Sequence, residues 1–175
     1  MQDDVEDGAR YLIHEGIADP DEIAIVGASY GGYAALMGLV RDPALFRCAV
    51  DWAGVTDIDL MYTNNWSDLS PTWRRYGMPA LVGDRDKDKD QFAATSALRQ
   101  AARITQPVLL AYGGEDRRVP IDHGQKLRDA LKPHNPNVEW IEYPDEGHGW
   151  MKEANQVDFW TRVEAFLERH LKNAR

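Results

Sequence analysis

The sequence has 175 residues, of which 43% are hydrophobic, and a formal net charge of −9. The length predicts a single domain over residues 1–175 with one sizeable core, and the apolar content excludes a disordered chain. The acidic balance excludes nucleic acid as a partner, because phosphate binding requires clustered Lys and Arg side chains.

Helical and extended patterns alternate along the chain. Short, continuous apolar runs rich in β-branched residues, of which residues 23–26 are the first, are typical of strands buried on both faces of a parallel sheet. Apolar positions spaced three and four apart indicate helices between these runs. In chain order, the pattern predicts a helix over 5–16, a strand over 23–26, a helix over 33–41, a strand over 48–52, a helix over 94–103, a strand over 108–112, a helix over 123–131, a strand over 138–143 and a helix over 155–171.

Strands that alternate with helices predict an α/β fold in which about four parallel strands are flanked by helices. The strand over 138–143 alternates polar and apolar residues, as an edge strand does. The segment over 57–80 is aromatic, and we expect it to be irregular.

The charged segment over 84–90 places a carboxylate at every second position, as a calcium loop does. An EF-hand requires Gly at loop position 6 and Glu at position 12, but counting from Asp86 these positions hold Gln91 and Ala97. Interleaved Lys and Arg also neutralise the segment. We therefore predict a solvated loop, and no metal ion.

A membrane span requires roughly 18 consecutive apolar residues, which the sequence does not contain. Residues 1–6 are acidic where a signal peptide requires basic residues followed by an apolar stretch. We therefore expect a cytoplasmic protein without a membrane partner. The single cysteine, Cys48, precludes an internal disulfide, and its apolar surroundings favour a small core side chain over a reactive thiol.

Residues 27–31 form the pattern G-x-S-x-G, directly after a predicted buried strand and just before a predicted helix. In this context the serine lies on a sharp turn that exposes its hydroxyl group. We expect side chains at Gly27 and Gly31 to collide with neighbouring backbone at this bend. Ser29 is the predicted nucleophile, and the backbone N–H of Tyr30, near the helix N-terminus, is the predicted oxyanion donor. An ordinary glycine-rich turn with Ser29 as a helix cap is the alternative.

A serine hydroxyl group requires a base before it can attack a substrate. His148 lies between two glycines in the loop after the last predicted strand. Loops at the carboxyl ends of parallel strands gather at one edge of the sheet, so His148 is the predicted base. His123, which begins the helix after the third strand, is the alternative. The other histidines lie on outer helices or in a Pro-rich turn: His14, His170 and His134.

The imidazole requires a carboxylate that fixes its orientation. Asp116 lies in the loop after the third predicted strand, at the same edge of the sheet, and is the predicted acid. Glu115 is adjacent and stays an alternative. The resulting chain order of serine, aspartate and histidine is that of α/β-hydrolases.

These motifs resemble the catalytic domain of the prolyl oligopeptidase family of serine peptidases, which includes dipeptidyl peptidases, acylaminoacyl peptidases and oligopeptidase B. The resemblance covers essentially the whole chain. It is carried by GASYGGY at 27–33, GVTD at 54–57, GEDRRVP at 114–120 and EGHG at 146–149.

The resemblance implies an α/β-hydrolase fold with Ser29, Asp116 and His148 as nucleophile, acid and base. It also implies a substrate pocket lined by Val55, Tyr62 and Trp66. Members of the family are much longer, with a β-propeller and a hydrolase domain that begins several strands before the nucleophile. We therefore expect this chain to be the C-terminal half of the hydrolase domain, a truncated fold that lacks the loop completing the oxyanion hole.

The predicted reaction is hydrolysis of a peptide or ester bond through an acyl-serine intermediate, without a cofactor, and it is expected to be weak because the oxyanion loop is missing. A carboxylesterase for small esters is one alternative. A catalytically silent fragment that folds and self-associates is the other.

The strand over 23–26 would form an open edge if the earlier half of the sheet is absent. It contains no Lys, Pro or inward-pointing charge, the features that protect natural edge strands. We therefore expect a homodimer in which this strand pairs with its own copy, the commonest closed arrangement. The alternative is a monomer in which the helix over 5–16 covers the edge.

Overall fold

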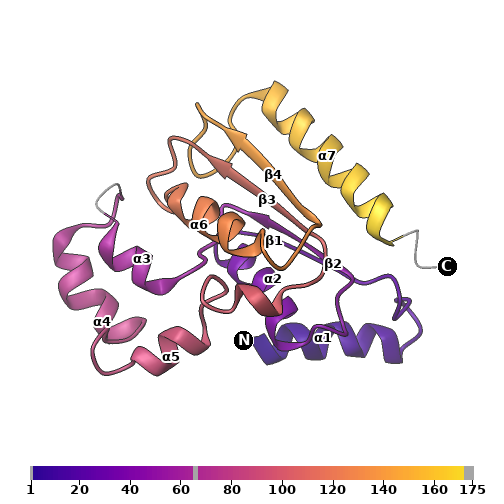
Figure 1. Ribbon diagram of the computed structural model, residues 1–175, viewed down its shortest axis with the longest axis horizontal. Coiled ribbons are helices and arrows are strands. Elements are labelled where there is room, and N and C mark those ends of the chain that lie inside the picture. Colours follow the sequence, from indigo (N-terminus) through magenta and orange to yellow (C-terminus); the bar gives the residue numbers. More distant parts are fainter. Residues whose placement is uncertain (1, 65–66, 172–175) are drawn as a thin grey trace.

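A computed structural model describes residues 2–64 and 67–171. Its centre is a parallel sheet of four strands in the order β1-β2-β3-β4 (Figure 1). The strands are β1 (Ala24–Ala28), β2 (Cys48–Trp52), β3 (Val108–Gly113) and β4 (Val138–Tyr143). The predicted fold class is therefore confirmed, and β4 is an edge strand as expected.

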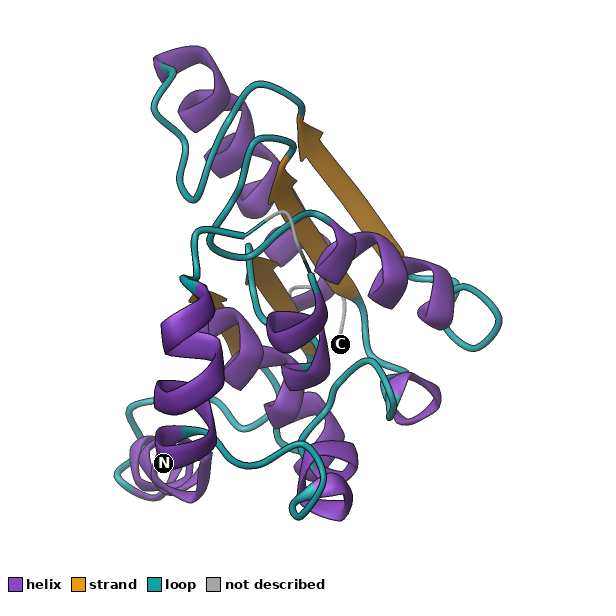
Figure 2. Ribbon diagram, turned by 90° about the vertical axis from the view of Figure 1, so that its left-hand side faces the viewer, coloured by secondary structure: helices purple, strands orange, loops and turns teal. Residues whose placement is uncertain are grey.

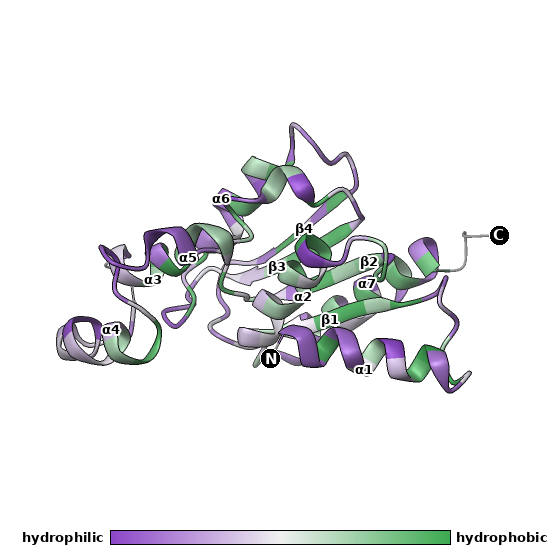
Figure 3. Cartoon of the chain, turned by 90° about the horizontal axis from the view of Figure 1, so that it is seen from below, coloured by the Kyte–Doolittle hydropathy of each residue, from purple (hydrophilic) through white to green (hydrophobic). Residues whose placement is uncertain are grey.

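Helices cover both faces of the sheet (Figure 2). The long helices are α1 (Gln2–His14), α2 (Tyr30–Arg41), α6 (Asp122–Leu131) and α7 (Glu153–Leu171). One core lies between the sheet and α1, α2 and α6, and a second core lies between the sheet and α7. Alternate residues of a strand serve the two cores: Leu110 and Tyr112 face the first, whereas Leu109 and Ala111 face the second. This division explains why residues 108–112 of β3 form a continuous apolar run (Figure 3).

The segment between β2 and β3 differs from the prediction. Instead of an irregular stretch followed by a helix over 94–103, the structure forms short helical pieces. These are α3 (Ile58–Thr63), a π-helical turn (Trp73–Gly77), α4 (Met78–Leu81), α5 (Lys89–Ala94) and a 3₁₀ turn (Ala101–Arg103). Of these pieces, α3, α4 and α5 lie beyond one end of the sheet (Figure 1).

The helix predicted over 94–103 is wrong because Ser96 interrupts it. The Ser96 hydroxyl group lies 3.0 Å from Asp57 Oδ2 and 3.2 Å from the Thr56 carbonyl oxygen, and it accepts the Arg99 N–H. A buried serine that bonds in this way competes with helical hydrogen bonds. In the loop over 84–88, the Asp84 carboxylate accepts the backbone N–H groups of Asp86 and Lys87.

Among the described residues, no helix is long and apolar enough to cross a membrane. Within the part of the chain that the structure describes, β2 is the only strand that pairs with β1. Val26, in the middle of β1, is 47% exposed. The helix α1 packs on α2 through Ala9 and Ile13.

Candidate active site

Ser29 occupies the single residue between β1 and α2, in a conformation that few residues other than glycine adopt. Its φ is 56° and its ψ is −118°, and its N–H donates to the Trp52 carbonyl oxygen at 2.8 Å. A Cβ atom on Gly27 would lie 2.1 Å from the Gly31 carbonyl oxygen, so the turn requires glycine at position 27. Strain of this kind is typical of functional turns and raises the serine side chain above the sheet edge.

The expectation for Gly31 is wrong, since a Cβ atom there would meet nothing within 4 Å. The constrained glycine is the next residue, Gly32, where a Cβ atom would lie 2.1 Å from Asp51 Oδ1 and 2.8 Å from the Gly54 Cα atom. The helix α2 therefore packs closely on the end of β2 in its first turn.

A chain of two hydrogen bonds joins the three predicted residues across the carboxyl edge of the sheet. His148 Nε2 lies 2.9 Å from Ser29 Oγ, and His148 Nδ1 lies 2.7 Å from Asp116 Oδ2. The His148 side chain is 26% exposed, whereas Asp116 is fully buried. The arrangement allows the imidazole to accept the serine proton while its other nitrogen donates to the carboxylate.

The backbone of its own loop holds Asp116 in place. Asp116 Oδ1 accepts the N–H groups of Arg118 at 2.8 Å and Val119 at 2.9 Å, which leaves Oδ2 for the imidazole. Glu115 is exposed, and its N–H donates to the Glu146 carbonyl oxygen at 2.9 Å. Asp116, and not Glu115, thus supplies the carboxylate beside His148.

Glu146 organises the His148 loop, a role that the sequence analysis missed. Its buried carboxylate accepts the N–H groups of Met151 and Lys152, each at 2.9 Å, and the Asn155 amide at 2.8 Å. Burial works to raise the pKa of this carboxyl group, but these three donors outweigh burial and lower the pKa. An acid two residues before a predicted catalytic histidine was the available signal.

Tyr30 is the first residue of α2, so its backbone N–H lies at the positive end of that helix. The residue is 53% exposed, and its ring lies 5.6 Å from the Tyr33 ring, measured between centroids. The role of this N–H as an oxyanion donor stays a prediction.

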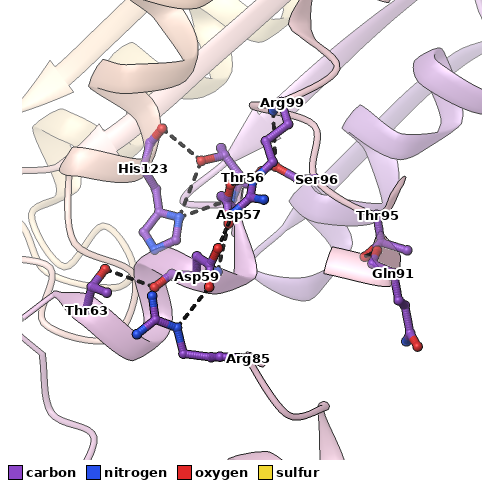
Figure 4. Close-up of polar contacts among 10 residues, drawn as sticks. All are labelled: Thr56, Asp57, Asp59, Thr63, Arg85, Gln91, Thr95, Ser96, Arg99 and His123. Carbon is purple, nitrogen blue, oxygen red and sulfur yellow. Dashed lines mark hydrogen bonds and ion pairs between the residues drawn. The ribbon is translucent and has the colours of Figure 1, made fainter. Parts of the chain in front are cut away.

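His123, the alternative base, lies away from Ser29 and is fully buried on α6. Its Nδ1 accepts the Thr56 N–H at 3.2 Å, and its carbonyl oxygen accepts the Thr56 hydroxyl group at 3.0 Å (Figure 4). Burial lowers the pKa of His123 to about 4. This histidine therefore fixes the start of the segment after β2 and does not contact the serine.

The predicted pocket residues lie on the segment after β2. Val55 is partly buried against the core beneath α2. Tyr62 lies on α3, where its hydroxyl group donates to the Gly83 carbonyl oxygen at 2.5 Å and its ring lies 6.1 Å from the Phe92 ring. Trp66 lies outside the described residues.

A network of ion pairs anchors α3 (Figure 4). The buried Asp57 carboxylate accepts the Asp59 N–H at 2.7 Å, which caps α3, and the Arg99 Nε–H at 2.8 Å. Arg99 also pairs with the Asp59 carboxylate, which pairs in turn with Arg85 at 2.9 Å. A buried carboxylate requires such a partner, so this network ties α3 to the loops that carry Arg85 and Arg99.

A serine on a strained strand-to-helix turn, joined through a histidine to a buried aspartate at the edge of a parallel sheet, defines the α/β-hydrolase class. The family model described as the prolyl oligopeptidase family matches residues 1–174. The chain belongs to this family.

The chain is similar to dipeptidyl aminopeptidase BIII of Pseudoxanthomonas mexicana, with 32% identity over 98% of this chain and 25% of that protein. It is also 31% identical to dipeptidyl peptidase family member 6 of Caenorhabditis elegans, over 98% of this chain and 23% of that protein. Among solved structures, a puromycin-hydrolyzing peptidase of Mycobacterium tuberculosis superimposes with a TM-score of 0.84 at 27% identity, covering 94% of this chain and 24% of that one. The chain thus spans about a quarter of the length of these relatives.

Proposed function

We propose that the chain is a serine hydrolase that cleaves an acyl bond through an acyl-Ser29 intermediate. The observation that carries the proposal is the pair of hydrogen bonds, 2.9 Å and 2.7 Å long, that joins Ser29, His148 and Asp116. Membership in a family of serine peptidases supports the same chemistry.

In the proposed mechanism His148 Nε2 takes the proton of Ser29 Oγ as the oxygen bonds to the substrate carbonyl carbon. The Tyr30 N–H donates to the oxyanion that forms. When the intermediate collapses, the bond to the leaving group breaks and His148 returns the proton to that group. A water molecule, deprotonated by the same nitrogen, then releases the acyl group and restores Ser29. Asp116 holds the imidazole in position throughout.

The proposed substrates are peptide bonds, because the chain is similar to two dipeptidyl peptidases and a puromycin-hydrolyzing peptidase. We propose slow turnover for this chain alone. Its described residues offer one backbone donor that can be assigned to the oxyanion, and loss of one such donor costs about 10²–10³ in kcat. Activated esters, which have better leaving groups than amides, should therefore react faster than peptides.

Labelling with a fluorophosphonate probe tests the proposal. We expect the wild-type chain to be labelled at Ser29, and Ser29→Ala to fold normally without label. His148→Ala should lose almost all labelling and ester hydrolysis, since removal of a triad residue costs about 10⁴–10⁶ in kcat. A folded wild-type chain that resists the probe would refute the proposal in favour of a catalytically silent chain. A panel of aryl esters and peptide amides separates esterase from peptidase.

A further inference from the structure

Asp51 is a buried acid that the proposed mechanism does not use. It lies on β2, opposite Gly27 in the strand register, with an exposed fraction of zero. None of the described residues forms a salt bridge with it, and no hydrogen bond to its Oδ1 exists in the same part of the chain. A carboxylate buried with so few donors would be strongly destabilised.

The contacts of Asp51 Oδ2 indicate where its proton lies. The Tyr112 hydroxyl oxygen is 2.6 Å from Asp51 Oδ2 and 2.9 Å from the Gly54 carbonyl oxygen. The tyrosine carries one proton for these two contacts, so it must share that proton between both oxygens or donate it to one of them. A neutral Asp51 would supply a second proton, so that its carboxyl group donates to the Tyr112 oxygen while the Tyr112 hydroxyl group donates to the Gly54 carbonyl oxygen.

The surroundings of the carboxyl group agree with this assignment. Burial raises the pKa of Asp51 to about 7, against the opposing effects of the Tyr112 hydroxyl group and the nearby Gly54 amide. Burial likewise raises the pKa of Tyr112 well above its usual range, so the phenol keeps its proton. The residues facing Asp51 from β1 and α2 are Gly27 and Gly32, which carry no charge.

The other carboxyl oxygen of Asp51, Oδ1, lies between the turn at Gly32 and the turn at Gly54. A Cβ atom on either Gly32 or Gly54 would lie 2.1 Å from Asp51 Oδ1, so this oxygen fills the gap between the two glycines. Gly32 belongs to the first turn of α2, directly after Ser29, whereas Gly54 precedes Val55.

We propose that Asp51 is a positioning residue that acts as a neutral acid, holding the first turn of α2 against the Gly54 turn without placing a negative charge beneath the oxyanion site. The inference rests on the proposed function. The N-terminus of α2 carries a partial positive charge of about half an elementary charge, which favours the oxyanion. Ionised Asp51 would oppose that charge and lower kcat/KM about tenfold, the effect expected of one charge at a helix end.

The test compares Asp51→Asn with the wild type across pH, using hydrolysis of an activated ester. Asn keeps the shape of the neutral acid, and its amide group can donate to Tyr112. The ratio of kcat/KM, variant over wild type, should be near one at about pH 6 and should rise to about five at about pH 8, where about nine-tenths of Asp51 would be ionised. Effects of pH that the two proteins share cancel from the ratio. Asp86→Asn, on an exposed side chain of the 84–90 loop, is the control and should keep the ratio flat.

Infrared spectroscopy gives a second measurement that does not depend on activity or on the variant. Wild-type protein at about pH 6 should show the carbonyl band of a protonated carboxyl group, and the band should fade as the pH rises through about 7. A flat activity ratio in folded Asp51→Asn, or no protonated carboxyl band in the wild type, would overturn the proposal. If the fluorophosphonate probe fails to label Ser29 while the infrared carboxyl band fades with rising pH as described, the proposed function fails. The assignment of a neutral Asp51 then still stands.

Discussion

Replacing His123 with Asn should remove part of the acid sensitivity of the fold. In the structure, the unprotonated Nδ1 of His123 accepts the Thr56 N–H, and Nε2 is buried without a hydrogen bond among the described residues. Protonation would place a second donor against the Thr56 N–H and a charge in the core. The Oδ1 atom of Asn can take the place of Nδ1 as acceptor, but Asn cannot be protonated.

The magnitude follows from the change in the pKa of His123. Burial lowers this pKa from 6.5 to about 4, and each pKa unit corresponds to about 1.4 kcal/mol. Because the folded-state pKa is the lower one, the unfolded chain binds the proton first as the pH falls. The stabilisation is therefore complete above about pH 6.5 and is lost by about pH 4, for a total of about 3 kcal/mol.

The assay is the free energy of unfolding from urea titrations at several pH values between about 4 and 7.5. The stability of His123→Asn relative to the wild type should rise by about 3 kcal/mol as the pH falls across this range. Other titrating groups, including Asp51, act in both proteins and cancel from the difference. His134→Asn, at an exposed histidine, is the matched control and should give no such trend. A constant difference between His123→Asn and the wild type would refute the reasoning.

Three further predictions concern loops, the pocket and assembly. Glu146→Gln should lower the free energy of unfolding by about 2 kcal/mol and lower kcat, because the glutamine amide group would place its N–H groups against the Met151 N–H. Equal urea midpoints for the variant and the wild type would contradict this. Arg99→Met should raise KM several-fold with little change in kcat, because α3 would lose the ion pairs of Arg99 with Asp57 and Asp59. A lower kcat with an unchanged KM in steady-state kinetics would contradict the anchoring role. We also propose a homodimer through the open edge of β1, to which Val26 belongs: light scattering should give a dimer mass for the wild type and a monomer mass for Val26→Lys, and a folded wild-type monomer at micromolar concentration would exclude it.

The sheet could be predicted from the sequence because its signals are local. The first three strands are short, largely apolar runs and β4 alternates polar and apolar residues, and the predicted strands agree with the observed ones to within two residues. The rule that carboxyl ends of parallel strands meet at one edge was enough to bring the loops of Ser29, Asp116 and His148 together.

The segment between β2 and β3 could not be predicted, because its structure depends on contacts between distant residues. Arg99 reaches Asp57 across 42 positions of the sequence, and Ser96 reaches it across 39. Neither contact leaves a periodic pattern. The constraint on Gly32 could not be predicted either, because it comes from Asp51 on β2. Gly31, which belongs to the G-x-S-x-G motif, has open space beside it.

Three buried acids near the site differ in the number of donors that surround them. Asp116 receives two backbone N–H groups and the imidazole, and Glu146 receives two backbone N–H groups and an amide. Asp51 meets the Tyr112 hydroxyl group, which has one proton for two acceptors, and it lies near the Gly54 amide. Three donors favour a carboxylate, whereas one shared hydroxyl group favours a neutral acid, because an uncompensated charge in the core is far more costly than a proton. The donors that decide between these states are mostly backbone N–H groups of loops, so the chemical state of each acid follows from the fold around it and not from the side chain alone.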